Sequence, residues 1–259
     1  MTRTHLKHWR VYTDGVDLSG YSRNIGALNW SFESQPEAAL TDAVKNMIMG
    51  KCDIQAGPIN AFLDNDAAGA FALAGTGAND HGTRNVMVVM GANAAPAAGD
   101  NIFAWQFEQT SYQVEPGAGF VVANIPLGGA SYASTLTYKK PWGFLLHAKG
   151  AETAVNTATG LDDNAAATTL GGMFIYHIFT SNGTVTVKAQ DAATNSDGSF
   201  ADITSATSGS VDASAAPKHG MIALGTTSTI RRYTRWQIVL GTATTVTFAS
   251  ALIRNNLAV

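Results

Sequence analysis

The segment Met173-Phe-Ile-Tyr-His-Ile-Phe-Thr-Ser-Asn-Gly-Thr-Val-Thr-Val-Lys-Ala-Gln190 gives the clearest indication of fold class in this chain. Its two parts, 173–180 and 184–190, are rich in β-branched and aromatic residues, which favour strands. Between them lies Asn182-Gly183, a pair that suits the positive φ angles of a tight hairpin turn. The segment therefore predicts two strands joined as a β-hairpin.

Similar patterns continue through the rest of the chain. Thr229–Leu240 and Thr244–Ile253 flank a short Gly-Thr-Ala turn and predict another strand pair. Asp14-Gly15 separates two short extended stretches and predicts a hairpin. In Leu28–Glu33 apolar and polar residues alternate, as in a half-buried strand. Further strands are predicted at Trp9–Thr13, Val16–Leu18, Ile59–Leu63, Arg84–Met90, Asn101–Phe107, Gly119–Ile125 and Gly143–His147.

One segment has helical spacing instead. Four of its apolar residues fall at positions i, i+4, i+7 and i+8, namely Leu40, Val44, Met47 and Ile48. Pro36 suits the first helical position, Glu37 lies near the positive end of the helix, and Gly50 can end it. We predict one helix over about residues 36–49, lying against a β-sandwich or barrel. A shorter helical turn is possible at Ala67–Ala74.

The chain has 259 residues, of which 46% are apolar, enough for one large core or two modest ones. We place a boundary close to Lys140-Pro141, so that residues 1–142 form a β-domain with the helix and residues 143–259 form a second β-sandwich domain. Ala151–Thr169 is the best candidate for a linker or long loop. Asp66–Gly82, rich in Gly and Ala, is predicted as a loop.

The composition suits contact between copies of the chain. Only 14% of the residues are charged, against about a quarter in a typical domain. Small residues are abundant instead, with 42 Ala, 28 Thr and 26 Gly. Such a neutral surface favours close association. The net charge of −3 argues against a protein that binds phosphates through bulk charge.

The single cysteine, Cys52, excludes an internal disulfide framework and a cysteine-based zinc site. The first residues lack an apolar stretch long enough for a signal peptide. The longest apolar run, Val86–Met90, is far too short to cross a bilayer. We expect a chain kept in a reducing, aqueous compartment.

No pattern in the sequence assembles a catalytic, cofactor or metal site. The phosphate-loop, nucleophile-elbow and H-E-x-x-H motifs are absent. Gly75-Thr-Gly77 lacks the third glycine of a dinucleotide-binding loop, because position 80 is Asp80. Gly117-Ala-Gly119 is better interpreted as a turn. We therefore expect no enzymatic activity, no cofactor and no resident metal.

Six histidines are scattered along the chain: His5, His8, His81, His147, His177 and His219. His147 and His177 lie in strand patterns with apolar neighbours, which favours hydrogen-bonded histidines within a sheet. His5 and His8 could share a metal, but an exposed terminus is the better interpretation.

One acidic loop resembles a calcium loop in composition and contains Asp191, Asn195, Asp197, Gly198 and Asp202. Ala193 occupies the position of the first acid in the calcium-loop pattern, so a polar turn at Asp197-Gly198 is favoured over a cation site. Asp162-Asp163-Asn164 and Asp64-Asn-Asp66 are interpreted as loops in the same way.

The basic residues cluster once, in Thr229–Trp236. Arginine beside Tyr and Trp can bind single-stranded nucleic acid. Strand alternation divides the set, however, with Arg231 and Arg235 on the face opposite Arg232. Pairing with carboxylates across a sheet or a subunit interface is therefore favoured. The five tryptophans could stack on carbohydrate, but core packing is the default for Trp9, Trp30, Trp105, Trp142 and Trp236.

Seven blocks, in order along the chain, carry a resemblance to a known family. They are Tyr12-Thr-Asp-Gly-Val-Asp-Leu-Ser-Gly-Tyr21, Leu40–Lys45, Ile59–Asp64, Arg84–Val88, Phe107–Tyr112, Arg232–Gln237 and Thr245–Ala249. Together they resemble the major tail (tail tube) proteins of long-tailed bacteriophages. No single block is diagnostic, but the set covers most of the chain.

The resemblance implies a tail-tube-like β-sandwich or barrel with a flanking helix, in a virion protein that is not an enzyme. Such proteins close into rings and stack into a tube with an acidic channel wall, through which the genome passes without being bound. It implies partners of three kinds: other copies, tail proteins at the tube ends, and passing DNA. The second module at 143–259 would be either a tube-like duplicate or an outer decoration. A duplicate would need three copies per ring and a decoration six, so the number of copies stays undecided between three and six. The alternatives are a capsid decoration or head-fibre protein and a carbohydrate-binding adhesion module.

Overall fold

The computed structural model describes residues 6–37, 46–63, 82–92, 95–116, 121–130, 140–162 and 166–255. Within these ranges the chain is mainly β, as predicted, and contains no α-helix, only the 3₁₀ turns η1 (Leu6–His8) and η3 (Asp197–Ser199). The strands are β1 (Trp9–Thr13), β2 (Val16–Asp17), β3 (Ser22–Ile25), β4 (Leu28–Glu37), β5 (Asn46–Ala56), β6 (Ile59–Phe62), β7 (Gly82–Met90), β8 (Asn101–Gln109), β9 (Gln113–Pro116), β10 (Val121–Ile125), β11 (Leu127–Ala130), β12 (Trp142–Glu152), β13 (Leu161–Asp162), β14 (Gly172–Ser181), β15 (Thr184–Ala192), β16 (Ala201–Thr207), β17 (Val211–Asp212), β18 (Lys218–Leu224), β19 (Tyr233–Leu240) and β20 (Val246–Arg254).

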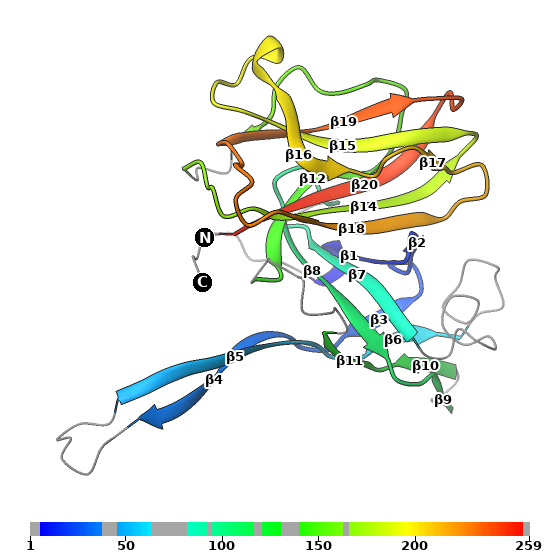
Figure 1. Ribbon diagram of the computed structural model, residues 1–259. Helices are drawn as coiled ribbons and strands as arrows, with labels where there is room; N and C mark the ends of the chain where they lie inside the picture. The colour runs from blue at the N-terminus through cyan, green and yellow to red at the C-terminus, as the bar shows by residue number, and fades with distance from the viewer. Residues whose placement is uncertain are drawn as a thin grey trace.

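These strands form four sheets (Figure 1). The largest has the order β18-β14-β20-β12-β8-β7-β1-β2, with β11 beside β8. A five-stranded sheet has the order β13-β19-β15-β16, with β17 beside β15. A four-stranded sheet has the order β3-β6-β10-β9, and β4 pairs with β5.

The predicted hairpin at Asn182-Gly183 is wrong, although both of its strands exist. β14 belongs to the largest sheet and β15 to the five-stranded sheet, so the turn carries the chain from one layer to the other. Neither Asn182 nor Gly183 is among the described residues with positive φ. β14 is buried on both faces, since Phe174 and Tyr176 enter one core while Met173 and Ile175 enter the other. Such a strand takes partners from its own layer on both sides.

The predicted pairing across Gly241-Thr-Ala is wrong for the same reason, because β19 and β20 also lie in different sheets. The two crossing turns are hydrogen-bonded to each other. Thr184 and Thr242 each donate a backbone N–H to the other's Oγ1, both at 2.9 Å. The backbone N–H of Thr244 donates to Asn182 Oδ1 at 2.9 Å. These bonds join the two layers at one end of the sandwich.

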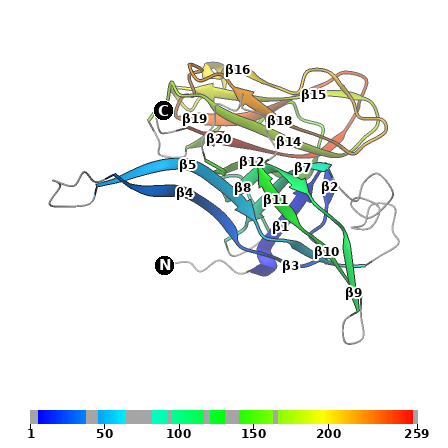
Figure 2. The same ribbon diagram turned by 60° about the horizontal axis from the view of Figure 1, so that its bottom comes forward.

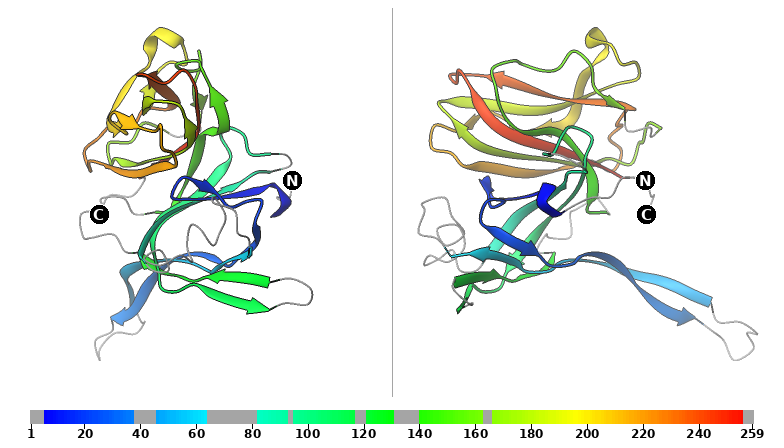
Figure 3. Two further views of the ribbon diagram at one scale, coloured as in Figure 1. Left: turned by 90° about the vertical axis from the view of Figure 1, so that its right-hand side faces the viewer. Right: turned by 180° about the vertical axis from the view of Figure 1, so that it is seen from behind.

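Two hydrophobic cores follow from this layering. One lies between the five-stranded sheet and the β18-β14-β20-β12 part of the largest sheet, which together form the C-terminal sandwich. This core includes Phe174, Trp236 and Phe248. The other gathers β1, β7 and β8 with the inner face of the four-stranded sheet, and includes Phe103 and Phe107. The largest sheet contributes side chains to both cores, which places it in the middle of the molecule (Figure 3).

The predicted hairpin at Asp14-Gly15 is confirmed. Thr13 pairs with Val16, and Asp14 and Gly15 have φ angles of 51° and 83°. Glycine is required at the second position for a further reason: a Cβ on Gly15 would overlap Pro217 and the backbone of Lys218. The turn is therefore held tightly against the C-terminal sandwich.

The predicted helix over residues 36–49 is wrong at both of its ends. Residues 36–37 end β4 and residues 46–49 begin β5, with Pro36 opposite Met47; residues 38–45 lie outside the described ranges. The antiparallel ladder begins at Leu28 opposite Ala56 and overrides the local helical spacing. The result is a two-stranded arm, β4–β5, that projects from the body in every view (Figures 1, 2 and 3).

The division into residues 1–142 and 143–259 stays a prediction. The largest sheet crosses this boundary, because β12 pairs with β8 on one side and with β20 on the other. The stretch Ala151–Thr169 begins inside β12 and contains β13, and its residues 163–165 lie outside the described ranges. The predicted turn at Ala67–Ala74 lies outside the described residues, as does the predicted loop up to residue 81.

Candidate functional site

A row of four amide side chains crosses the four-stranded sheet from edge to edge. Asn24 on β3, Asn60 on β6, Asn124 on β10 and Gln113 on β9 are successive register partners. Asn60 Nδ2 donates to Asn24 Oδ1 at 2.6 Å, and Asn124 Nδ2 donates to Asn60 Oδ1 at 2.9 Å. Both hydrogen bonds run in the same direction, toward β3. The row lies on the face turned away from the core. The residues before and after Asn60 on β6 are buried, and so are those before and after Asn124 on β10, so the two amides point to the opposite face.

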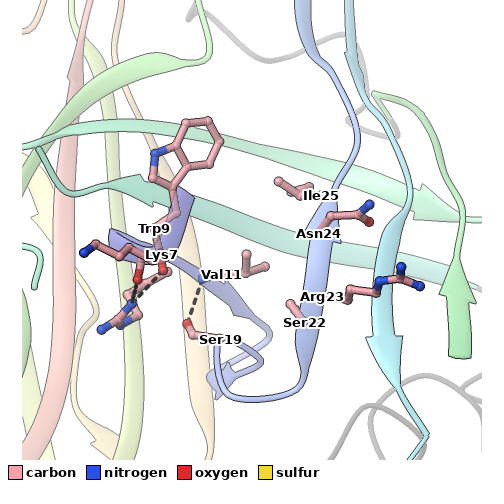
Figure 4. Close-up of a pocket in the computed structure, with 9 residues that line it drawn as sticks. Lys7, Trp9, Val11, Ser19, Ser22, Arg23, Asn24 and Ile25 are labelled. Atoms are coloured by element: carbon pink, nitrogen blue, oxygen red, sulfur yellow. Dashed lines mark hydrogen bonds between the residues drawn. The ribbon is translucent and has the colours of Figure 1, made fainter. Parts of the chain in front are cut away.

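A groove of about 190 Å³ separates β1 from the outer edge of β3. Val11 and Ile25 point into it from opposite sides (Figure 4). Three of its described lining residues are cationic, namely Lys7, Arg10 and Arg23, and none carries a carboxylate. The groove therefore offers an apolar floor with a basic margin beside an open strand edge.

A bulge on β3 directs its side chains unequally. The register shifts between Ser22 and Asn24, which leaves Arg23 as the extra residue. Arg23 and Asn24 consequently project on the same side of the strand, while Ser22 points toward the groove (Figure 4). The Ser22 hydroxyl oxygen is buried without a hydrogen-bond partner among the described residues.

The opposite edge of the same sheet, β9, is exposed along its whole length. Val114 is 49% exposed, and Glu115 beside it is also exposed. Other exposed apolar side chains lie at this end of the sheet, on β6 and β10 and just after β6: Phe62, Leu63 and Val121. The two edges thus differ in charge, with a cation on β3 and a carboxylate on β9.

His177 lies in a buried cluster that ties the β1–β2 turn to the C-terminal sandwich. Its Nδ1 accepts the backbone N–H of Gly15 at 3.0 Å. Its ring lies beside those of Tyr12, Phe179 and His219, with centroids 6.1, 6.4 and 6.5 Å away. Nε2 has no partner among the described residues, and complete burial lowers the pKa of His177 to about 3. The prediction of a hydrogen-bonded sheet histidine is confirmed, with a role in packing.

Polar partners of the same turn surround this histidine. Asp14 accepts from Arg84 Nη1 at 3.0 Å and from the backbone N–H of Asn85 at 2.9 Å. His219 lies 2.6 Å from Asn85 Nδ2 and 3.5 Å from Asp14 Oδ1. Burial lowers the pKa of His219, an effect that the carboxylate of Asp14 opposes. The cluster couples β7, β18 and the first hairpin.

His147 is likewise a structural residue. Its Nε2 lies 2.9 Å from Glu152 Oε1, and its Nδ1 lies 3.2 Å from the carbonyl oxygen of Phe248. The ring stacks on that of Phe248 with centroids 4.2 Å apart and meets Trp236 edge-on at 4.8 Å. These contacts confirm the prediction of a hydrogen-bonded sheet histidine at His147.

The arginines near β19 pair with carboxylates, as the sequence indicated. Arg232 forms a bidentate pair with Asp162 at 2.7 and 2.8 Å. Arg235 is almost completely buried; it reaches Asp197 at 2.5 Å and stacks on Phe200 at 4.2 Å. Their guanidinium groups do not form a common surface for nucleic acid.

The acidic loop does not converge on a cation position. Asp191 accepts the backbone N–H of Arg231 at 2.7 Å, and Asp202 accepts from Lys188 and Gln190 at 2.7 and 2.9 Å. The side chain of Asn195 forms hydrogen bonds with the backbone of Gly160, and Asp197 accepts a hydrogen bond from Arg235. The favoured polar turn is present as η3.

The tryptophans that the structure describes contribute to packing. Trp105 and Trp236 are buried, while Trp9 and Trp142 pack against the first core. Trp30 lies in β4. Core packing is therefore confirmed for the first four.

Other expected positions are only partly described. His8 ends η1, whereas His5, His81, residues 163–164 and 64–66 lie outside the described ranges. Within those ranges no group of three His, Cys, Asp or Glu side chains is placed to hold a metal. No described helix is long and apolar enough for a membrane span.

The amide row was not predicted from the sequence. Its signal was the presence of Asn60 and Asn124 at outward positions of two predicted strands. The alignment of these residues into one row depends on which strands pair, and that information is tertiary.

No protein-family model matches the chain, and no curated protein is similar to it in sequence. Among solved structures the chain is similar to the SPP1 Dit (gp 19.1) protein, described as a paradigm of the hub adsorption apparatus in Gram-positive infecting phages. The identity is 12%, the match covers 94% of this chain and 98% of that one, and the TM-score is 0.31. A TM-score this low does not establish a common fold.

Proposed function

We propose that this chain is a structural protein of a bacteriophage tail, whose copies close into rings that stack as a tube for the passing genome. It would act through contacts with its own copies and with tail proteins at the tube ends, without catalysis. The sequence resemblance to tail tube proteins supports this proposal, and so does a composition poor in charge and rich in small residues. Assembly would place it in the virion.

The observation that carries the proposal is the β4–β5 arm. Its strands have 10 and 11 residues and, within the described chain, pair only with each other. The base of this hairpin packs on the first core through Leu28, Ile54 and Ala56. Beyond such a layer, a two-stranded hairpin without a third strand is marginally stable in water. An arm that projects from the body (Figure 2) would gain that layer from a neighbouring copy. Self-assembly supplies such a neighbour at every position of a ring.

The outward face of the four-stranded sheet refines what a channel wall would look like. Its middle carries the neutral amides Asn60 and Asn124. These amides carry no positive charge that could bind DNA. The charged residues of this face lie at its two edges, Arg23 on β3 and Glu115 on β9. A channel wall whose middle is neutral would therefore let DNA pass without binding it, as an acidic wall would.

Electron microscopy of negatively stained protein over a concentration series tests the proposal. Rings or hollow tubes of even width are expected, and the count of subunits decides between three and six. Uniform small particles at every concentration and salt would contradict it. Binding to preformed capsids or to glycans would then favour a decoration protein or an adhesion module.

An arm variant sharpens the test. Ser31 and Asp53 are register partners, so joining them by Asn-Gly removes residues 32–52 and leaves a two-residue hairpin. We expect a monomer with an unchanged core that no longer assembles. A control that replaces only residues 38–45 by Asn-Gly keeps both strands and should still form rings. Unimpaired tubes from the first variant would show that the arm is not the assembly element.

A further inference from the structure

We propose that β9 of one copy pairs with β3 of the next, and that the amide row sets the register of this contact by joining Asn24 to Gln113 of the neighbouring copy. The inference rests on the proposed function, because it needs a ring of copies. It adds which two edges meet and which residues align them.

The direction of the hydrogen bonds is the first argument. Asn124 donates to Asn60, and Asn60 donates to Asn24. Asn24 therefore stands at the receiving end of the row with an amide N–H₂ still to offer at the β3 edge. Gln113 stands at the other end, exposed on β9 opposite Asn124. A primary amide there can accept from Asn24 of the next copy and donate within its own row.

The strand directions are the second argument. All three pairings in the sheet are antiparallel, so the four strands alternate in direction from β3 to β9. When copies are joined head to tail, β9 of one and β3 of the next run in opposite directions. The antiparallel pattern then continues without interruption. Because the two edges are different surfaces, the contact is heterologous and closes into a ring by rotation.

The side chains flanking the row are complementary as well. Alternation places Val114 on the inner face of β9, opposite the buried Ala123. In the next copy this side faces the groove lined by Val11 and Ile25. Glu115 returns to the outer face, where the bulge has placed Arg23 (Figure 4). An apolar contact and an ion pair thus flank the amide contact.

Two features of the β3 edge disfavour pairing with strands other than β9. A bulge and a charged side chain on an edge strand both discourage indiscriminate strand addition. An incoming edge with a negative charge beside Arg23 is therefore favoured over one with a positive charge. Among the residues of β9 only Glu115 is acidic.

Disulfide cross-linking tests the register directly. In a Cys52→Ser background, the double variant Asn24→Cys with Gln113→Cys is oxidised after assembly and run on a denaturing gel. Bridging needs Cβ atoms about 3.5–4.5 Å apart, which only the proposed register provides. A ladder of covalent multimers up to the full ring is expected. Asn24→Cys with Val114→Cys is the matched control, since Val114 is as exposed but lies on the other face, and it should remain monomeric on the gel.

Each outcome has one meaning. If electron microscopy shows wild-type rings but the Asn24–Gln113 pair gives no ladder, the inference is wrong and the proposed function stands. A ladder from the Val114 control in place of the Gln113 pair also overturns it. If wild-type protein forms no rings at all, both proposals fail.

A charge exchange gives a second measurement that does not depend on oxidation. Asn24→Lys with Gln113→Lys should weaken assembly, whereas Asn24→Lys with Gln113→Glu should restore it. Loss of one hydrogen bond corresponds to about a fivefold rise in the concentration needed for assembly at each interface. The like-charged pair should exceed that value. Equal assembly by both double variants would overturn the proposed register.

Discussion

The buried imidazole of His177 lowers the free energy of unfolding as the pH falls, by an amount that follows from its pKa in the folded and unfolded states. The side chain has no exposed surface, and its Nδ1 is occupied by the backbone N–H of Gly15. A proton on Nδ1 would turn this acceptor into a donor facing another donor. Burial, and more weakly the neighbouring His219, hold the pKa of His177 at about 3 against an ordinary value of 6.5.

The size and sign of the effect follow from these two pKa values. The unfolded chain takes up the proton below about pH 6.5, while the folded chain resists it down to about pH 3. The unfolded state therefore binds more protons over this interval, and the free energy of unfolding falls as the pH falls. The loss due to His177 is about 2 kcal/mol between pH 7.5 and pH 5, and about 3 kcal/mol by pH 4.

The assay compares wild type with His177→Asn by urea unfolding at pH 7.5, 6 and 5. The asparagine amide oxygen can take the place of Nδ1 as acceptor but does not titrate. We expect the variant to be less stable at pH 7.5 because a ring is lost from the core. The stability gap should then shrink by about 2 kcal/mol toward pH 5. Parallel pH curves for the two proteins would refute the reasoning, since they would mean that His177 titrates equally in both states.

Three further predictions concern the second core and its edges. Phe248→Ala removes a fully buried ring that stacks on a histidine, and should lower the free energy of unfolding by about 3–5 kcal/mol in urea titration. Arg235→Ala leaves the Oε1 atom of the buried Gln190 without its donor and should cost about 2 kcal/mol, measured the same way; a cost below 1 kcal/mol would contradict the role assigned to this pair. Arg232→Ala, by contrast, breaks an exposed pair and should cost at most about 1 kcal/mol. A larger loss at high salt than at low salt would contradict this assignment.

Much of the fold could be predicted from local patterns. The strand-forming residues of β7, β8 and β14 stand out by composition, and the Asp14-Gly15 turn was predicted with its partners. Turns of this kind are decided within a few residues, because only some residues tolerate positive φ. The histidine and arginine roles were also predictable, since buried or strand-bound polar groups need partners whatever the fold.

The pairing of strands could not be predicted in the same way. Asn182-Gly183 is as good a hairpin signal as Asp14-Gly15, yet it crosses between layers because β14 is required by two cores. The helical spacing around Met47 was equally misleading, since strand pairing along β4 and β5 outweighs it. Local preference amounts to tenths of a kcal/mol per residue, which a long ladder exceeds.

The sequence by itself determined a mainly β chain with few charges, its tight first turn, and the apolar runs that fill its cores. These properties depend on residue types and on spacing within a few positions. Only the tertiary structure decided which strands share a sheet, that the segment after Leu28 becomes a projecting arm, and that four amides align from β3 to β9. Each of these depends on contacts between residues far apart in sequence, and their free energies are fixed by the packing of whole layers.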